Sequence, residues 1–452
     1  MKFYLVLLLF LSTVSISLAQ HSINKDYYDI SQTLIAESLK DSSVFERLTE
    51  LVDRFPARIS GSENLEKAID WIVVEMKKDG FDAVYTQPVL VPKWVRGNEY
   101  CEITSPVSKK IPMLGLGGSV ATPKKGISAD VIVFKTITEL KENIGLVKGK
   151  IVLINQEFES YGKTVSIRSQ SAIEAAKGGA KAALIRSVAS FSMQTPHTGT
   201  MRYDDTVEKI PTAAISTEDA AWIDRTIQRG RKVTLKLYME AHFEKESLSR
   251  NIVAELKGSE KPDEIVVIGG HIDSWDVGQG AMDDAGGCVV SWEALKLLKK
   301  LNIKPKRTIR AVFWTNEENG LCGAQAYGDS AKVASENHVA AIESDAGVFR
   351  AKGFGFGGKE VNLPVLKELA KLLASIQADG MTMGGGGADI GPLMSEGVPG
   401  FGLNVNGEKY FWYHHTEADT IDKLDPYEVN TCVAAMSVLS YVLAEMPHNL
   451  IK

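Results

Sequence analysis

The chain has 452 residues and a formal net charge of −6 at pH 7, with 44% hydrophobic and 24% charged residues. This composition is ordinary for a soluble globular protein, and the length indicates two domains or one large one. No basic run or patch is visible, which argues against a nucleic-acid partner. The four cysteines lack zinc-finger spacing and are too few for a disulfide scaffold: Cys101, Cys288, Cys322 and Cys432.

The first residues have the features of a secretory signal peptide. Lys2 gives a positive start, residues 3–11 are strongly apolar, and residues 17–19 resemble a cleavage site. The apolar stretch is shorter than the ~20 residues that span a bilayer, so we expect no membrane span after residues 1–19 are removed. Residues 20–40 are either a pro-segment or the start of the mature chain. We expect secretion, with the lysosome or another secretory compartment as the alternative.

A helix and a strand open the folded part of the chain. Ser62 is a good N-cap and Gly80 a typical C-terminal stop. Between them, apolar residues repeat at helical spacing: Leu65, Ile69, Ile72 and Met76. The pattern predicts an amphipathic helix over residues 62–80, followed by a strand over residues 81–89.

From about Ile111 to His242 the pattern changes to short apolar strands broken by glycine and charge. One helix is predicted there, over residues 171–177, and the predicted strands cover residues 130–134, 151–154, 182–185 and 233–238. We interpret residues 111–245 as a β-rich domain inserted between the two segments of another domain, 41–110 and 246–452.

Strands and helices alternate after residue 250. Predicted strands cover residues 252–256, 265–268, 308–314, 338–344 and 400–403, and predicted helices cover 285–300, 323–329, 363–374 and 426–445. The run at 265–268 is continuously apolar, as is typical of a strand buried on both faces. This alternation predicts an α/β fold, an α/β/α sandwich around a largely parallel mixed sheet.

Candidate zinc ligands accompany these strands. Zinc binds imidazole nitrogen and carboxylate oxygen, and the chain offers five such residues: His271, Asp283, Glu318, Asp345 and His415. Three predicted strands are followed directly by histidine or acidic residues, and the carboxyl ends of parallel strands meet at one edge of a sheet. The pattern predicts a two-metal hydrolytic site, with Glu317 as a carboxylate that can take a proton from water.

Each candidate taken alone has an ordinary structural explanation. A lone histidine such as His271 is more often a hydrogen-bonded structural residue. The Asp-Asp pair at 283–284 precedes a predicted helix and can cap it. The Glu-Glu pair at 317–318 fits a solvated loop, and the His-His pair at 414–415 fits a surface. Their joint occurrence in an α/β context favours the metal site.

Several segments resemble the co-catalytic dizinc metallopeptidases, a family that includes aminopeptidases and carboxypeptidases. They are GGHIDSWD at 269–276, GAMDDAG at 280–286, WTNEE at 314–318, ESDAG at 343–347 and HHTEADT at 414–420. The middle stretch looks like the protease-associated domain of part of that family. Segments 186–192, 196–199 and 275–280 are most similar to its carboxypeptidase branch.

The resemblance implies two Zn²⁺ ions per chain in a zinc exopeptidase fold. His271 and Asp345 would hold one ion, Glu318 and His415 the other, and Asp283 would bridge both.

The resemblance also implies a general base and an orienting residue. Glu317 would be the base, and Asp273 would orient His271. His414 stands beside the expected ligand, but the family pattern places a histidine directly before Ser or Thr, which favours His415.

The implied activity is hydrolysis of short peptides, chiefly dipeptides with an unblocked C-terminus, by a homodimeric exopeptidase. An aminopeptidase of the same fold would use the same ligands. A one-zinc glutaminyl cyclase lacks the inserted domain, and a non-catalytic receptor-like relative would lack ligands that this chain has. The glycine run at 384–387 is either a mobile rim of the active site or a plain flexible loop.

Overall fold

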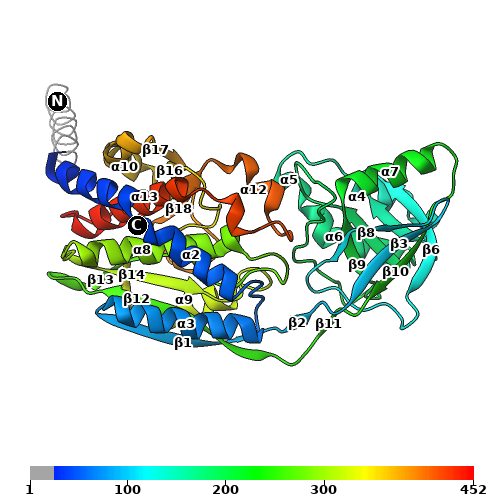
Figure 1. Cartoon of the computed structure of the whole chain (residues 1–452), viewed down its shortest axis with the longest axis horizontal. Helices are drawn as coiled ribbons and strands as arrows, with labels where there is room; N and C mark the ends of the chain where they lie inside the picture. The colour runs from blue at the N-terminus through cyan, green and yellow to red at the C-terminus, as the bar shows by residue number, and fades with distance from the viewer. Residues whose placement is uncertain (1–24) are drawn as a thin grey trace, which may run out of the picture.

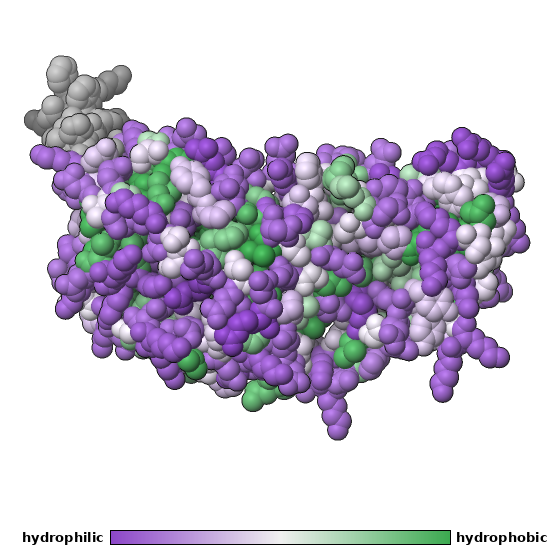
Figure 2. Space-filling model, viewed as in Figure 1, coloured by the Kyte–Doolittle hydropathy of each residue, from purple (hydrophilic) through white to green (hydrophobic). Residues whose placement is uncertain are grey.

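The computed structural model describes residues 25–452, so the predicted signal peptide over residues 1–19 lies outside the described residues. Within the described part, two units lie side by side, each built on an eight-stranded sheet (Figure 1). The chain passes between them through β2 (Trp94–Val95) and β11 (His242–Phe243), which pair antiparallel. Hydrophilic residues cover most of the face seen in Figure 2.

The sheet of the larger unit has a parallel centre and antiparallel additions. Its order is β1 (Ala83–Val91), β12 (Ser247–Leu256), β14 (Arg307–Trp314), β13 (Lys261–His271), β15 (Asn337–Glu343), β18 (Gly400–Val405), β16 (Ala351–Gly357) and β17 (Gly380–Met383). Strands β14, β13, β15 and β18 run parallel, whereas β1, β12 and β16 run antiparallel to their inner neighbours. The prediction of a largely parallel mixed sheet is confirmed.

Helices cover both faces of this sheet because the central strands are apolar on both sides. In β13, Val266 and Ile268 belong to one buried cluster with α8 (Gly286–Lys300) and α13 (Pro426–Glu445). Ile265 and Val267 belong to the opposite cluster, with α9 (Cys322–Val333) and α11 (Gly391–Ser395). Alternate side chains of a strand point to opposite faces, so one strand joins two cores in an α/β/α sandwich.

The helix predicted over residues 62–80 is present with the expected cap and stop. In α3 (Glu63–Asp79), the Ser62 hydroxyl accepts a hydrogen bond from the Leu65 N–H, and Gly80 ends the helix with a φ of 75°. Two further helices, α2 (Ser43–Arg54) and α10 (Leu363–Ala370), pack against the same core. Helix α13 is long and apolar enough to span a membrane, but 83% of its apolar window is buried inside the protein, so it is a core helix.

Residues 25–40, in the segment considered as a pro-segment, form a helix that packs on the larger unit. Leu34 and Ile35 are buried in the main core, and the side-chain amide of Gln32 donates to the carbonyl of Leu372 at 2.9 Å. This segment is therefore an integral part of the packed core.

The sheet of the smaller unit starts earlier than predicted. Its order is β4 (Lys109–Ile111), β3 (Glu99–Ser105), β10 (Thr234–Met239), β6 (Ile127–Phe134), β7 (Ile151–Ile154), β8 (Ala182–Arg186), β9 (Thr212–Ile215) and β5 (Met113–Gly115). Strand β3 lies before the predicted boundary at residue 111, yet it pairs with β10 about 130 residues later in the chain. Such a long-range pairing leaves no local signal in the sequence.

The smaller unit also holds more helix than the single one predicted over 171–177. Besides α6 (Ser166–Lys177), it contains α4 (Ile137–Glu142), α5 (Tyr161–Thr164) and α7 (Thr217–Gln228). Helix α7 has a typical N-cap in Ser216, whose hydroxyl accepts a hydrogen bond from the Asp219 N–H.

His338 in β15 couples stability to pH. Its side chain is buried, and its Nε2 lies 2.9 Å from the Tyr327 hydroxyl. Burial, which outweighs the attraction of Glu336, lowers the pKa of His338 to about 4. The unfolded chain takes up this proton near pH 6.5 but the folded chain does not until about pH 4, so acid favours unfolding between these values.

The wild type should lose unfolding free energy between pH 7 and pH 5, and we expect His338→Gln to lose about 2 kcal/mol less, because glutamine cannot take up that proton. Urea unfolding at both pH values measures this difference. The exposed His242 provides a matched control in His242→Gln, which should behave like the wild type. Equal pH dependence in His338→Gln and the wild type would contradict the assignment.

Candidate metal centre

The parallel strands bring the predicted site residues to one edge of the larger sheet. In the register of β13 with its neighbours, His271 is opposite Trp314, and Gly269 is opposite Glu343. The residues that follow β14 and β15 therefore start at the level where β13 ends. This alignment brings together side chains that are up to 74 positions apart in the sequence, from His271 to Asp345.

One group of candidate ligands forms around His271. Its Nε2 lies 3.2 Å from Oδ1 of Asp283 and 3.5 Å from Oδ1 of Asp345. The ligand atoms of all three lie within 4.8 Å of one another. His271 and Asp283 are buried, whereas the Asp345 side chain keeps 24% of its surface exposed. This spacing suits one metal ion.

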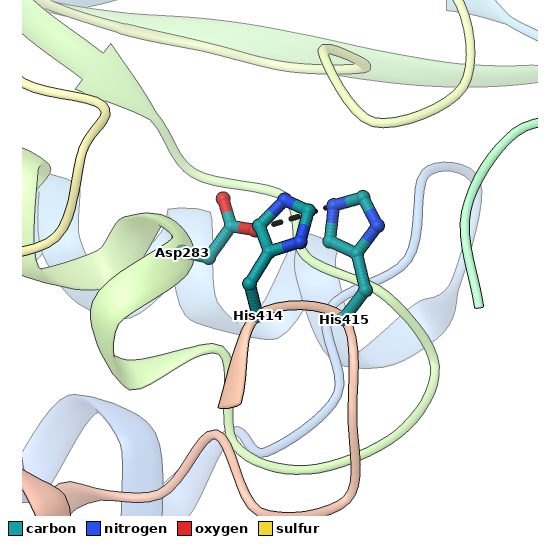
Figure 3. Close-up of side chains that lie close together, drawn as sticks. All are labelled: Asp283, His414 and His415. Atoms are coloured by element: carbon teal, nitrogen blue, oxygen red, sulfur yellow. Dashed lines mark ion pairs between the residues drawn. The ribbon is translucent and has the colours of Figure 1, made fainter. Parts of the chain in front are cut away.

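A second group forms on the other side of Asp283, where the two adjacent histidines meet it (Figure 3). The Nε2 of His415 lies 3.0 Å from Oε2 of Glu318 and 3.3 Å from Oδ2 of Asp283. Asp283 thus offers one oxygen to each group. All five predicted ligands lie together, with Asp283 in the middle as the bridging role requires.

His414 also reaches this group. Its Nε2 lies 3.4 Å from Oδ2 of Asp283, and its ring stacks on that of His415 at 3.5 Å between centroids. Only His415 of the two is paired with Glu318 within the described residues. Glu318 and Asp283 raise the pKa of His415 to about 10 against the effect of burial, whereas burial lowers the pKa of His414 well below its usual value. The geometry therefore favours His415 as the ligand.

Orphaned polar atoms show that the cluster fits a cation. Among the described residues, Nε2 of His271, Oδ2 of Asp283 and Oε1 of Glu318 are buried without a hydrogen-bond partner. Buried polar atoms are nearly always hydrogen-bonded, so three such atoms in one cluster require an explanation. All three atoms are of the kinds that bind zinc.

The crowding of carboxylates at this edge of the sheet also favours a bound cation. Burial and the nearby Asp283 raise the pKa of Glu318 to about 7. Loss of hydration, together with Asp345 and Glu318, raises the pKa of Glu317 well above its usual value. Neighbouring carboxylates in a poorly hydrated site disfavour one another's ionised form. A divalent cation removes that penalty, because it favours the ionised form of every carboxylate around it.

Asp273 does not contact His271 in the way predicted. Nδ1 of His271 lies 2.9 Å from the backbone carbonyl oxygen of Asp273, whereas the Asp273 carboxylate is 3.8 Å away. That carboxylate instead accepts hydrogen bonds from the backbone N–H of Glu317 at 3.0 Å and of Glu318 at 3.4 Å. The Asp273 side chain therefore orients the turn after β14, and its backbone carbonyl orients His271.

Asp284 takes the capping role that the sequence left open between the two aspartates. Its carboxylate accepts from the backbone N–H of Gly287 at 3.0 Å and of His271 at 3.1 Å. At Gly270, a Cβ atom would stand 2.1 Å from Oδ2 of Asp284, so only glycine allows this approach. Asp284 anchors the start of α8, which leaves Asp283 free to face the histidines.

The cluster opens into a cavity of ≈ 330 Å³ lined by both units. The smaller unit contributes Tyr161, Arg168 and Thr200, and the larger unit adds Tyr410 and Phe411 to the acidic and histidine residues. The ring of Tyr161 stacks on that of Phe411 at 5.0 Å. None of these five was a sequence candidate, because no local motif marks them, and the three from the smaller unit reach the site only through the contact between the units.

The glycine run at 384–387 is not among the residues that line this cavity, and two of its glycines lie directly against neighbouring groups. A Cβ atom at Gly385 would stand 2.0 Å from the backbone of Gly355, and one at Gly387 would stand 2.0 Å from the side chain of Glu343. A side chain at Gly385 or Gly387 would therefore displace β16 or Glu343, whereas Gly384 is exposed with no neighbour near its Cβ position. Because the run lies outside the cavity lining, the structure gives no support to the interpretation as a rim of the active site.

Comparison with known proteins agrees with this geometry. Residues 251–440 match the model of peptidase family M28, and residues 102–223 match that of the PA domain. Carboxypeptidase Q of Xenopus laevis is 44% identical to this chain, and the match covers 93% of this chain and 90% of the relative. Carboxypeptidase Q of Homo sapiens is 45% identical, and the match covers 89% of this chain and 85% of the relative. A solved peptidase M28 precursor from Shewanella amazonensis SB2B is 35% identical with a TM-score of 0.91, covering 95% of this chain and 99% of that one. The chain therefore belongs to peptidase family M28 and is a metallopeptidase with a PA domain inserted into its peptidase unit.

Proposed function

We propose that this protein is a dizinc exopeptidase that hydrolyses short peptides, chiefly dipeptides with a free C-terminus. The observation that carries the proposal is the position of Asp283 between two groups of zinc-type ligands at a small cavity. The cavity, ≈ 330 Å³, is at the lower end of the range of about 300–1,000 Å³ for small-ligand sites, which suits a short substrate. The similarity to the relatives named carboxypeptidase Q also supports the proposed activity.

The chain supplies a base for peptide hydrolysis beside the metal ligands. When bound, zinc polarises the scissile carbonyl and lowers the pKa of water from 15.7 towards about 7. Glu317 lines the cavity, and the Asp273 carboxylate fixes its backbone N–H at 3.0 Å. Glu317 accepts the proton of the attacking water and then donates it to the leaving amine. Its raised pKa suits a group that must hold that proton between the two steps.

We expect Glu317→Gln to lower kcat by about 10²- to 10⁴-fold, because glutamine cannot accept the proton. Zinc content should stay at the wild-type level, since Glu317 is not one of the ligands. Dipeptide hydrolysis and elemental analysis of the same preparation measure both quantities. The surface residue Glu396, which pairs with Lys332, gives the control Glu396→Gln. Near-normal kcat in Glu317→Gln would eliminate this role.

Arg168 can recognise the C-terminal carboxylate of the substrate. Among the described residues that line the cavity, it is the only arginine or lysine. Its Nε is buried without a hydrogen-bond partner, while Nη1 donates to the carbonyl of Thr198 at 3.0 Å and Nη2 donates to the Tyr161 hydroxyl. A guanidinium beside an otherwise acidic cavity favours an anionic substrate end, which is what a free C-terminus supplies.

In Arg168→Gln, the preference for a dipeptide over its C-terminal amide should fall about 10- to 100-fold. A hydrogen bond to a charged group contributes about 1.5–3 kcal/mol, and 1.4 kcal/mol corresponds to a factor of ten. The measurement is the ratio of kcat/KM for the two substrates, which cancels any effect common to both. The exposed Arg202 gives the control Arg202→Gln. A wild type that cleaves the amide equally well would instead indicate an aminopeptidase.

We also propose that the chain is exported after removal of residues 1–19 and acts as a homodimer, with the lysosome as an alternative destination. The support is the apolar N-terminal segment and the similarity to the carboxypeptidase branch. N-terminal sequencing of protein from the medium should find Gln20 first if residues 20–40 are retained, and sedimentation should give twice the chain mass. Protein retained in cells with Met1 intact would contradict export.

A further inference from the structure

A short segment of the inserted PA domain reaches into the metal centre. We call residues 197–200 the strap. Within it, the Thr198 N–H donates to the backbone carbonyl of His415 at 3.0 Å, and the Thr198 carbonyl oxygen lies 3.3 Å from Nδ1 of His415. A neutral imidazole that presents Nε2 to a metal carries its proton on Nδ1, so it donates that proton to Thr198. One residue of the smaller unit therefore holds both the backbone and the ring of this ligand.

Arg168 holds the same carbonyl in place from the other side. Its Nη1 donates to the Thr198 oxygen at 3.0 Å and lies 3.0 Å from Nδ1 of His415. A guanidinium has only donors, so Arg168 donates to Nδ1 of His415 when that nitrogen carries no proton, whereas the Thr198 carbonyl accepts from Nδ1 when it does. Gly199 makes this possible, because its φ is 137° and a Cβ atom there would stand 1.4 Å from Nη1 of Arg168.

The strap also contacts the second ligand of the same group. The Thr200 hydroxyl donates to the backbone carbonyl of Glu318 at 2.6 Å. Among the described residues, hydrogen bonds from the strap reach His415 and Glu318, and none reaches His271 or Asp345. The contacts are therefore confined to one of the two groups of ligands.

The strap is itself fixed to the body of the smaller unit. The Thr198 hydroxyl donates to the carbonyl of Gly115 at 2.8 Å, and the Gly117 N–H donates to the Gly199 carbonyl at 3.0 Å. Gly115 belongs to β5 of the second sheet. The smaller unit can thus transmit its position to His415 and Glu318 through a few short hydrogen bonds.

We propose that the strap sets the affinity of the zinc site formed by Glu318 and His415, and leaves the site formed by His271 and Asp345 largely unaffected. This inference rests on the proposed two-zinc function. Partners that orient metal ligands typically change metal affinity by about 10- to 100-fold when they are removed. The inserted domain is then a working part of the metal centre as well as a wall of the cavity.

Two substitutions test the strap. Thr200→Val keeps the side-chain shape but removes the hydroxyl that holds Glu318, and Gly199→Ala forces Arg168 away from Thr198. The two dissociation constants for Zn²⁺ are measured on metal-stripped full-length protein by competition with a chromophoric chelator. We expect one constant to rise about 10- to 100-fold in each variant and the other to stay unchanged. Circular dichroism checks that each variant is folded.

Thr104→Val provides a matched control, because the exposed Thr104 hydroxyl also donates to a backbone carbonyl of the smaller unit, that of Thr234. It should keep both wild-type constants. Unchanged or equally weakened constants in Thr200→Val would overturn the role of the strap while leaving the two-zinc function intact. A wild-type protein that binds fewer than two ions would instead overturn the proposed function. If Gly199→Ala does not fold, Thr200→Val alone decides the question.

Discussion

Asp283 is a buried carboxylate placed between two histidines, and its burial is the constraint around which the rest of the site is arranged. The close ion-pair contacts with His271 at 3.2 Å and His415 at 3.3 Å hold the pKa of Asp283 well below its usual value, although burial acts in the opposite direction. A buried charge is tolerated only when opposite charge or hydrogen bonds compensate it. Here the compensation comes from two sides at once, which is why one residue can serve two groups of ligands.

The protein keeps Asp283 in this position by using its neighbours for structure. Asp284 binds the N–H groups of His271 and Gly287, so the start of α8 is anchored without Asp283. Asp273 similarly uses two different groups: its backbone carbonyl contacts His271, and its carboxylate accepts from the N–H of Glu317. His271 and the turn that carries Glu318 are therefore held by backbone hydrogen bonds, which orient these two candidate ligands before any metal binds.

The inserted domain adds residues to the wall of the cavity beside the candidate ligands. A bare sheet edge would leave the ligands exposed, whereas Arg168 and Tyr161 place a cation and an aromatic ring over an acidic cavity. The stacking of Tyr161 on Phe411 joins the two units directly beside the ligands. The proposed selection of substrate and the proposed control of zinc affinity thus both depend on contacts between units that are separated in the sequence and meet only in the folded chain.

The sequence by itself determined the parts of this protein that depend on local order. The apolar run of β13, the cap at Ser62 and the motifs that contain the candidate ligands predicted the α/β fold and the five candidate ligands that the structure brings together, since parallel strands end at one edge. Tertiary structure decided what depends on distant contacts. These are the pairing of β3 with β10, the turn of the Asp273 carboxylate away from His271, and the approach of Arg168 to His415. A local pattern cannot encode them, because each depends on which partner comes within reach only after distant segments of the chain have packed together.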